Sequence, residues 1–299
     1  MELSERFAGC LLGLACGDAV GTTLEFQPRG TFAPITDMVG GGAFGLQAGQ
    51  WTDDTSMALC LAESLVVCGG FNADDQMRRY VRWWQEGVWS SNGRCFDIGN
   101  TTVGALRRYM QSGHPFSGST DPMSAGNGSI MRLAPVPMFY FGDVGQAIHF
   151  AGESSRTTHG AAECVDACCF FAAVLWAALS GEEKTAVLQP HTYSPTTPRV
   201  QAIAAGAYLS KGEGEIRGSG YVVDSLEAAL WVFANTDSYE TAVLRAANLG
   251  DDADTTAAVV GQVAGAFYGR SGIPQKWLEK ITMLKEIETL AHQLMPAHH

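Results

Sequence analysis

Apolar residues recur along this chain mainly at spacings of three and four positions, which is the pattern of amphipathic helices. Strand-like alternation of apolar and polar residues is scarce. The segment 161–180 is apolar nearly all round, so we expect a buried helix there at the centre of the fold. The predicted helices cover residues 4–16, 55–67, 73–86, 101–112, 161–180, 199–210, 224–235, 238–248, 255–268 and 274–294.

The stretches between these helices are expected to be loops of one domain. Segments rich in Pro and Gly occur at 28–50, 113–137 and 189–198, but none is long or polar enough to be a clear linker. The chain has 299 residues and shows no internal repeat, a length that suits one large domain with a sizeable core. We therefore predict an all-α fold in which residues 1–299 form a single compact multi-helix domain.

Composition narrows the function classes. The net charge is −12, and the one basic cluster, at residues 78–82, is short, so we expect no nucleic-acid partner. The longest apolar run, Ala167 to Leu179, is shorter than the ~20 residues of a membrane span. None of the eight cysteines forms a C-x-x-C pair, which favours small core residues in a reducing compartment. We predict a cytoplasmic protein without a membrane partner, and a monomer because no long apolar seam is present.

The segment "NLGDDADTTAA", residues 248–258, places three carboxylates directly in front of a predicted helix. One aspartate there can cap the helix, and the helix dipole stabilises its negative charge. Asp251, Asp252 and Asp254 together exceed what a cap needs. Like charges ~4 Å apart repel each other by ~4 kcal/mol at an effective dielectric of 20. A further reason for the cluster is therefore expected.

A second segment, "QWTDDTSMALCLAE" at residues 50–63, has the same build. Thr52, Asp53 and Asp54 precede a helix that is predicted to begin near Thr55. If the two helix starts face each other, they combine carboxylates and hydroxyls into a set of hard oxygen ligands without Cys or His. Such a set suits Mg²⁺ or Mn²⁺ rather than zinc. The carboxylates could neutralise two divalent cations, and the spacing excludes an EF-hand.

Several motifs run in order from about residue 7 to residue 269: "GLACGDAVGTTLEF", "WTDDTSM", "FDIGNTT", "AGNGSIMR", "TTHGAAE" and "LGDDADTTAAVVGQVAGAFYG". Together they resemble the ADP-ribosylglycohydrolases, most closely the bacterial enzymes that remove ADP-ribose from arginine of dinitrogenase reductase. The resemblance implies an all-helical domain with a dinuclear Mg²⁺ or Mn²⁺ site on the floor of a cleft. Asp251 stands where the family commonly has Gly, so it is expected to point away from the cations or to support them indirectly. The implied metal ligands are Thr52, Asp53, Asp54, Asp252, Asp254 and Thr255.

The resemblance also assigns catalytic roles to Glu25 and Asp97. A glutamate in the loop after the first helix is implied to lie near the cations and to activate or position water. A solvated loop residue is the alternative. Asp97 is implied to face the guanidinium of the substrate, because a carboxylate accepts two parallel N–H bonds from that planar cation. The alternative is a helix cap, although Asn100 or Thr101 would suit that role better.

Ligand contacts are implied for two glycine-rich loops and two further side chains. The loop 40–46 matches G-x-G-x-x-G, but no strand precedes it, so a dinucleotide-binding fold is excluded. The resemblance places this loop and residues 125–132 along the ADP-ribose cleft. His159 is implied to lie against the ribose or diphosphate, and Tyr221 could stack on adenine; ordinary structural roles are the alternatives. The contacts expected from the second loop are Gly126, Asn127, Gly128 and Ser129.

The implied reaction is hydrolysis of the N-glycosidic bond between the anomeric ribose carbon and an arginine guanidinium. The substrate is an ADP-ribosylated protein, and ADP-ribose is the product. Two other readings stay open: a hydrolase of another ADP-ribose linkage (serine, phosphate ester or small molecule), and a catalytically silent ADP-ribose-binding relative. The presence of Asp97 favours an arginine linkage over the other linkages. The presence of all the implied acidic ligands argues against a catalytically silent relative. The choice between Mg²⁺ and Mn²⁺ stays open, as does which carboxylate acts as the base.

Overall fold

The computed structural model describes residues 1–296, and all regular secondary structure in that range is helical. This confirms the predicted all-α fold; residues 297–299 of the predicted domain lie outside the described range. The α-helices are α1 Leu3–Gly21, α2 Asp53–Cys68, α3 Ala73–Glu86, α4 Asn100–Ser112, α5 Pro135–Phe139, α6 Val144–Arg156, α7 Ala162–Ser180, α8 Lys184–Leu188, α9 Pro198–Ala204, α10 Val222–Ala234, α11 Tyr239–Ala247, α12 Ala253–Tyr268, α13 Gln275–Leu278 and α14 Leu284–Gln293.

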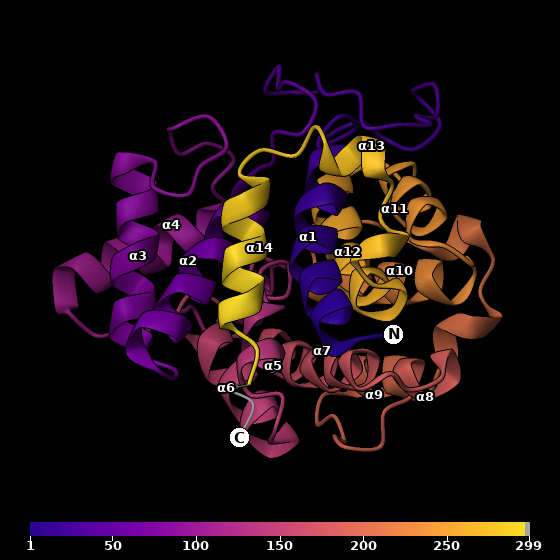
Figure 1. Ribbon diagram of the computed structural model, residues 1–299. Coiled ribbons are helices and arrows are strands. Elements are labelled where there is room, and N and C mark those ends of the chain that lie inside the picture. Colours follow the sequence, from indigo (N-terminus) through magenta and orange to yellow (C-terminus); the bar gives the residue numbers. More distant parts are fainter. Residues whose placement is uncertain (297–299) are drawn as a thin grey trace.

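Helices α1 and α12 form the centre of the molecule and lie side by side (Figure 1). Their backbones touch because small residues recur at every fourth position on the facing surfaces. A Cβ atom built on Gly13 would lie 2.2 Å from the carbonyl oxygen of Gly261, and one built on Gly265 would lie 1.9 Å from that of Gly9. The same contact continues from Gly17 to Ala257 and from Gly21 to Ala253, each carbonyl being within 2.4 Å of the added atom. Only glycine on α1 permits this approach.

Helix α7 is the buried helix that the apolar pattern predicted, and it packs on α6, α10 and α12. By length and composition it is long and apolar enough to cross a membrane, but 72% of its most apolar window is buried inside the molecule. Helix α7 is therefore a core helix. All eight cysteines are free thiols; six are buried as expected, whereas Cys68 is exposed and Cys95 is half-buried.

Several helix boundaries differ from the expected ones. The predicted helix at 274–294 is two helices, because Met283 adopts a left-handed conformation with φ of 55° between α13 and α14. The predicted helix at 199–210 ends at Ala204, and Gly206 with φ of 76° precedes a short 3₁₀ turn. The expected loop at 113–137 already contains the start of α5.

Helix α6 was not predicted, although a local signal for it is present in the sequence. The Asp143 side chain caps this helix by accepting a hydrogen bond from the Gln146 backbone N–H at 3.0 Å. The Gln146 side-chain amide also donates to Asp143, at 3.0 Å. An Asp followed three residues later by Gln is a recognised helix-start signal. Glycines at 145 and 152 weakened the helical pattern behind it.

Replacing Gly13 by Ala should destabilise the fold by about 1–3 kcal/mol, because the new methyl group would force α1 away from α12. Gly104→Ala on α4 is the matched control: its added Cβ meets only the flexible end of Arg108 at 3.3 Å. That control should gain about 0.5–1 kcal/mol from the loss of glycine entropy. Urea unfolding measures both effects. Equal stability of the two variants would contradict the close contact.

Candidate metal and ligand site

The two acidic helix starts face each other, as the paired motifs predicted. Thr52 Oγ1 lies 3.1 Å from Asp254 Oδ2, and Thr255 Oγ1 lies 3.4 Å from Asp54 Oδ2. Both helices begin two residues earlier than expected, at Asp53 and Ala253, so Asp53, Asp54 and Asp254 lie in the first turns and Asp252 is the N-cap residue of α12. Neither start is capped by its own side chains. The first-turn carboxylates are therefore not used as helix caps and are free to bind a ligand.

Asp254 belongs to two separate groups of three carboxylates. It meets Asp53 and Asp54 in one group, and Glu25 and Asp97 in the other. Within each group the oxygen atoms lie within 4.8 Å of one another. Because Asp254 belongs to both groups, the two groups together could hold two divalent cations.

Uncompensated negative charge at this place fits divalent cations. Asp54 Oδ1 and Glu25 Oε2 are buried and have no hydrogen-bond partner among the described residues. No Lys or Arg within residues 1–296 forms an ion pair with either acidic group. Burial, with the charge of neighbouring carboxylates added to it, raises the pKa of the Asp53, Asp54 and Asp254 carboxyls well above the usual range. Hard cations prefer such oxygen-only sets.

Asp18, which the sequence analysis did not single out, positions one side of this arrangement. It lies on α1, is fully buried, and accepts hydrogen bonds from the backbone N–H groups of Thr52 and Thr55 at 2.9 and 3.0 Å. It also accepts both threonine hydroxyl hydrogens, at 2.9 and 2.6 Å. Because a hydroxyl has one hydrogen, Thr52 Oγ1 presents only lone pairs to Asp54 and Asp254. Asp18 thereby caps α2 and leaves the lone pairs of Thr52 Oγ1 available to a cation.

Glu25 and Asp97 reach the second carboxylate group from loops. The loop after α1 is pinned to the loop before α12 by two backbone hydrogen bonds, from Phe26 N–H to Asp251 O at 2.7 Å and from Asp251 N–H to Gln27 O at 2.8 Å. Asp97 has φ of 59°, a left-handed conformation that Asp tolerates better than most residues. Burial and the charge of Asp97 raise the pKa of Glu25 to about 10, and burial raises that of Asp97 to about 7.

The remaining aspartates of the 251–254 cluster lie outside both carboxylate groups. Asp251 is exposed, and its backbone rather than its side chain serves the site. This position agrees with the expectation that it points away from the cations. Asp252 Oδ2 accepts a hydrogen bond from Asn127 Nδ2 at 2.8 Å, and Asp252 lines the cavity beside the groups. Its role as a metal ligand remains a prediction.

A cavity of about 260 Å³ lies above the carboxylates. The start of α4 contributes to its wall through Thr101 and Thr102, and the loop before α5 contributes Gly126, Asn127 and Gly128. Its lining also includes Glu25, Asp53, Asp97, Met131, His159, Gly220, Asp252, Asp254 and Thr255. We call it the acidic cavity.

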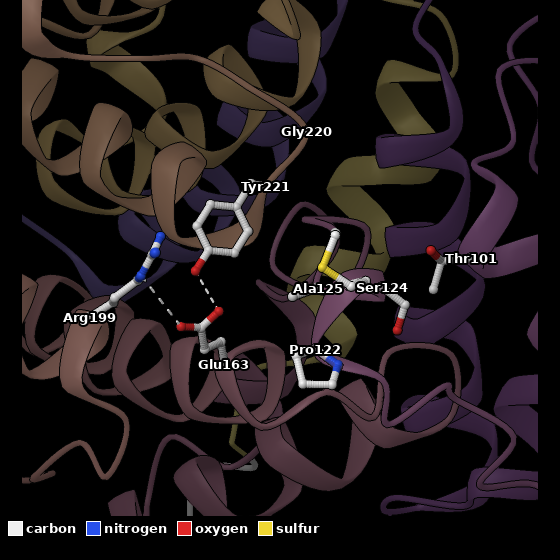
Figure 2. Close-up of a pocket in the computed structure, with 10 residues that line it drawn as sticks. Thr101, Pro122, Ser124, Ala125, Glu163, Arg199, Gly220 and Tyr221 are labelled. Atoms are coloured by element: carbon white, nitrogen blue, oxygen red, sulfur yellow. Dashed lines mark hydrogen bonds and ion pairs between the residues drawn. The ribbon is translucent and has the colours of Figure 1, made fainter.

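A second cavity, of about 610 Å³, adjoins the acidic cavity because Thr101, Gly126 and Gly220 line both. Figure 2 shows Tyr221 and Arg199 converging on Glu163 at its wall. The Tyr221 hydroxyl donates a hydrogen bond to Glu163, and the Arg199 guanidinium carbon lies 5.4 Å from the Tyr221 ring centroid. Tyr221, which is predicted to stack on adenine, therefore lines this second cavity, which we call the outer cavity. Glu163 holds its hydroxyl, and Arg199 lies over one face of its ring.

Two expected ligand contacts are not placed in either cavity. Ser129 is buried behind its loop, where its hydroxyl forms a hydrogen bond with Ser155 Oγ at 2.9 Å. The glycine-rich loop 40–46 lines neither cavity, although the family resemblance placed it along the cleft. Asn127 lines the acidic cavity, but its side-chain amide already donates to Ser225 and Asp252, each at 2.8 Å. It therefore orients Asp252 as well as facing the ligand space.

Replacing Asp254 by Asn should stabilise the metal-free protein by about 1–3 kcal/mol at pH 8, because one member of a mutually repelling set is removed. The stabilisation that Mg²⁺ or Mn²⁺ gives the unaltered protein should disappear. Asp166→Asn is the matched control, since Asp166 is equally buried but accepts hydrogen bonds from Tyr193, Thr196 and Thr197. It should lose about 1–3 kcal/mol and keep the cation effect. Thermal unfolding with chelator and with each cation tests both.

Metal-free protein should lose stability as pH rises from 5 to 8. Asp97 and Glu25 have folded pKa values near 7 and 10, above those of unfolded carboxyls, so the folded state holds more protons. Their contribution is complete below about pH 4 and is lost as pH passes through the raised values. Urea unfolding in chelator measures this slope, and Mg²⁺ should reduce it. A flat or rising stability in chelator would contradict the assignment.

Comparison with known proteins agrees with this geometry. A sequence profile of the family described as ADP-ribosylglycohydrolase matches residues 1–299. The chain is 48% identical over 293 residues to the "ADP-ribosylarginine hydrolase Tri1" of Serratia proteamaculans, covering 98% of this chain and 80% of that protein. It is 50% identical to the protein of the same name from Pseudomonas putida, covering 97% and 78%.

Two further similarities extend the comparison. The "ADP-ribosyl-[dinitrogen reductase] glycohydrolase" of Rhodospirillum rubrum is 32% identical over 301 residues, with 96% of this chain and 94% of that protein covered. A solved structure described as "ADP-ribosylglycohydrolase-related protein complex" superposes with a TM-score of 0.87 at 41% identity, covering 98% of each chain. On the profile match and these identities, the chain belongs to the ADP-ribosylglycohydrolase family.

Proposed function

We propose that this protein is a metal-dependent hydrolase that removes ADP-ribose from arginine side chains of modified proteins. The observation that carries the proposal is the pair of carboxylate groups that share Asp254 below the acidic cavity. The family membership and the two relatives named as ADP-ribosylarginine hydrolases support the same reaction. All the acidic residues expected of an active enzyme are present, which argues against a silent ADP-ribose-binding relative.

The arginine preference is supported by Glu25 and Asp97 at the cavity wall. Neither forms an ion pair with a basic residue in the described part of the chain, so both can receive a cationic group from outside. A guanidinium fits this place because a carboxylate accepts two of its N–H bonds in parallel. A serine hydroxyl carries no charge, so Glu25 and Asp97 would bind it less strongly than they would bind a guanidinium. The linkage is therefore assigned to arginine.

In the proposed reaction, a water oxygen bonds to the anomeric ribose carbon while the bond from that carbon to the guanidine nitrogen breaks. The water loses a proton, and the departing guanidine gains one to become guanidinium. Glu25 and Asp97 line the acidic cavity; Glu25 would accept the proton of the water, and Asp97 would stabilise the positive charge of the leaving group. Two divalent cations, Mg²⁺ or Mn²⁺, would neutralise the carboxylates and bind the ribose hydroxyls. Thr52, Asp53, Asp54, Asp254 and Thr255 would hold them, with Asp252 beside them.

The outer cavity is proposed to take the adenosine end of the substrate. Its position next to the acidic cavity suits an elongated ligand whose far ribose lies over the carboxylates. Tyr221 offers an aromatic ring on which a base could stack, and Arg199 packs over that ring. We also propose a monomer in the cytoplasm; eight free thiols suit a reducing compartment.

Asp97→Asn should lower turnover of arginine-linked ADP-ribose on the order of 10²-fold, because the charge that stabilises the leaving guanidinium is lost. Asn tolerates the left-handed backbone at this position, so the fold should persist. Binding of free ADP-ribose, measured by calorimetry, should change less than threefold. A matching loss of cation stoichiometry in this variant would instead make Asp97 a metal ligand.

The proposed function is tested by release of ADP-ribose from an arginine-modified protein beside a serine-modified one, each with Mg²⁺, Mn²⁺ or chelator. The expected result is cation-dependent release from arginine alone. Release from serine alone would overturn the linkage. Binding of ADP-ribose without release from either substrate would overturn the assignment as an arginine hydrolase.

A further inference from the structure

Arg132 is fully buried and has no carboxylate partner within residues 1–296. Its guanidinium carbon lies 4.7 Å from the Tyr80 ring centroid, and its Nε has no hydrogen-bond partner. A buried charge without an opposite charge is costly, so its retention calls for a specific role. Metal binding does not explain why this arginine is buried, because a positively charged guanidinium does not bind a metal cation.

The hydrogen bonds of Arg132 connect two loops of the ligand site. Its Nη1 donates to the carbonyl oxygen of Gly128 at 2.8 Å, and its Nη2 donates to Thr158 Oγ1 at 2.7 Å. Thr158 Oγ1 in turn lies 2.8 Å from His159 Nδ1. A continuous chain therefore runs from the guanidinium through one hydroxyl to the imidazole that lines the acidic cavity.

The protons in this chain can be placed by counting donors. Arg132 can only donate, so one lone pair of Thr158 Oγ1 is occupied. No other partner for this hydroxyl is present among the described residues, and Thr158 is fully buried. Its single hydrogen is satisfied only by donation to His159 Nδ1. If Nδ1 carried the proton instead, the hydroxyl hydrogen would be buried without an acceptor, which costs free energy. Nδ1 is therefore the acceptor, and the imidazole proton is on Nε2.

The opposite edge of the imidazole faces the ligand space. A Cβ atom built on Gly128 would lie 2.9 Å from Nε2, and one on Gly126 would lie 3.6 Å from it, so the ring packs on both glycines. The backbone from which the ring extends is fixed by two hydrogen bonds with Ser155, at 2.7 and 2.8 Å. Burial, with the charge of Arg132 added to it, lowers the pKa of His159 to about 3, so the ring stays neutral.

We propose that Arg132 and Thr158 are positioning residues that lock His159 in the Nε2–H tautomer, so that Nε2 offers a neutral hydrogen-bond donor to an acceptor oxygen of ADP-ribose. The identity of the ligand as ADP-ribose rests on the proposed function, whereas the tautomer of His159 does not. Nε2 has no partner among the hydrogen bonds of residues 1–296, so its N–H is available to a ligand. Because the donor is neutral, the ring adds no positive charge to a cavity that is built to hold cations.

The tautomer is measured on the unaltered protein by ¹⁵N NMR of labelled histidine at pH 7, with His159→Gln used to assign the signal. The expected spectrum has a protonated Nε2 and an unprotonated Nδ1. A proton on Nδ1, or an imidazolium, would overturn the proposal whether or not the protein hydrolyses anything. ADP-ribose should perturb the Nε2–H signal when it binds.

The positioning role is tested with two adjacent threonines that are equally buried. Thr158→Val should weaken ADP-ribose binding by about tenfold, whereas Thr157→Val should change it by less than about twofold. Thr157 donates to Ser154 O and accepts from Gln76 without touching His159, so it controls for general loss of packing. Thr158→Ser should restore both affinity and tautomer. Equal loss in the two valine variants would make the role of Thr158 merely structural.

Discussion

The direct backbone contact between α1 and α12 is the constraint on which the rest of the structure depends. Without side chains at Gly9, Gly13 and Gly261, these two helices approach until carbonyl oxygens fill the space that a Cβ would need. The start of α12 is thereby fixed beside Gly21 at the end of α1. Asp18, one turn earlier on α1, fixes the start of α2 through Thr52 and Thr55. One helix thus aligns both acidic starts.

In the resulting site, the clustered carboxylates repel one another unless cations from outside the protein compensate their charge. Its two carboxylate groups share Asp254; Asp97 is half-buried and the other members are buried, and none has a basic partner in the described part of the chain. The one fully buried guanidinium nearby, Arg132, is directed to a carbonyl, a hydroxyl and an aromatic face instead of to the acids. The protein therefore keeps positive charge away from the carboxylates. This separation leaves the carboxylates free to bind cationic groups from outside, which we propose are the divalent cations and the guanidinium of the substrate.

The sequence predicted the parts of this account that depend on local spacing. Thr52–Asp54 and Asp252–Thr255 could be recognised as a pair because each opens a helix with more carboxylates than a cap requires. Asp18 could not be recognised, because a lone aspartate inside an apolar helix carries no signal of what it caps 34 residues away. The Arg132–Thr158–His159 chain is equally invisible, since it depends on two loops meeting in space. Ser129 shared a motif with true lining residues but faces the opposite way.

The measurement that tests the central claim most directly is the anomalous scattering of Mn²⁺ in crystals of the unaltered protein. The account predicts two peaks that share Asp254, one beside Asp53 and Asp54 and the other on the side of Asp254 that faces Glu25. Two peaks that share Asp254 as a ligand would establish the dinuclear site below the acidic cavity. No peak, or cations bound elsewhere, would contradict it.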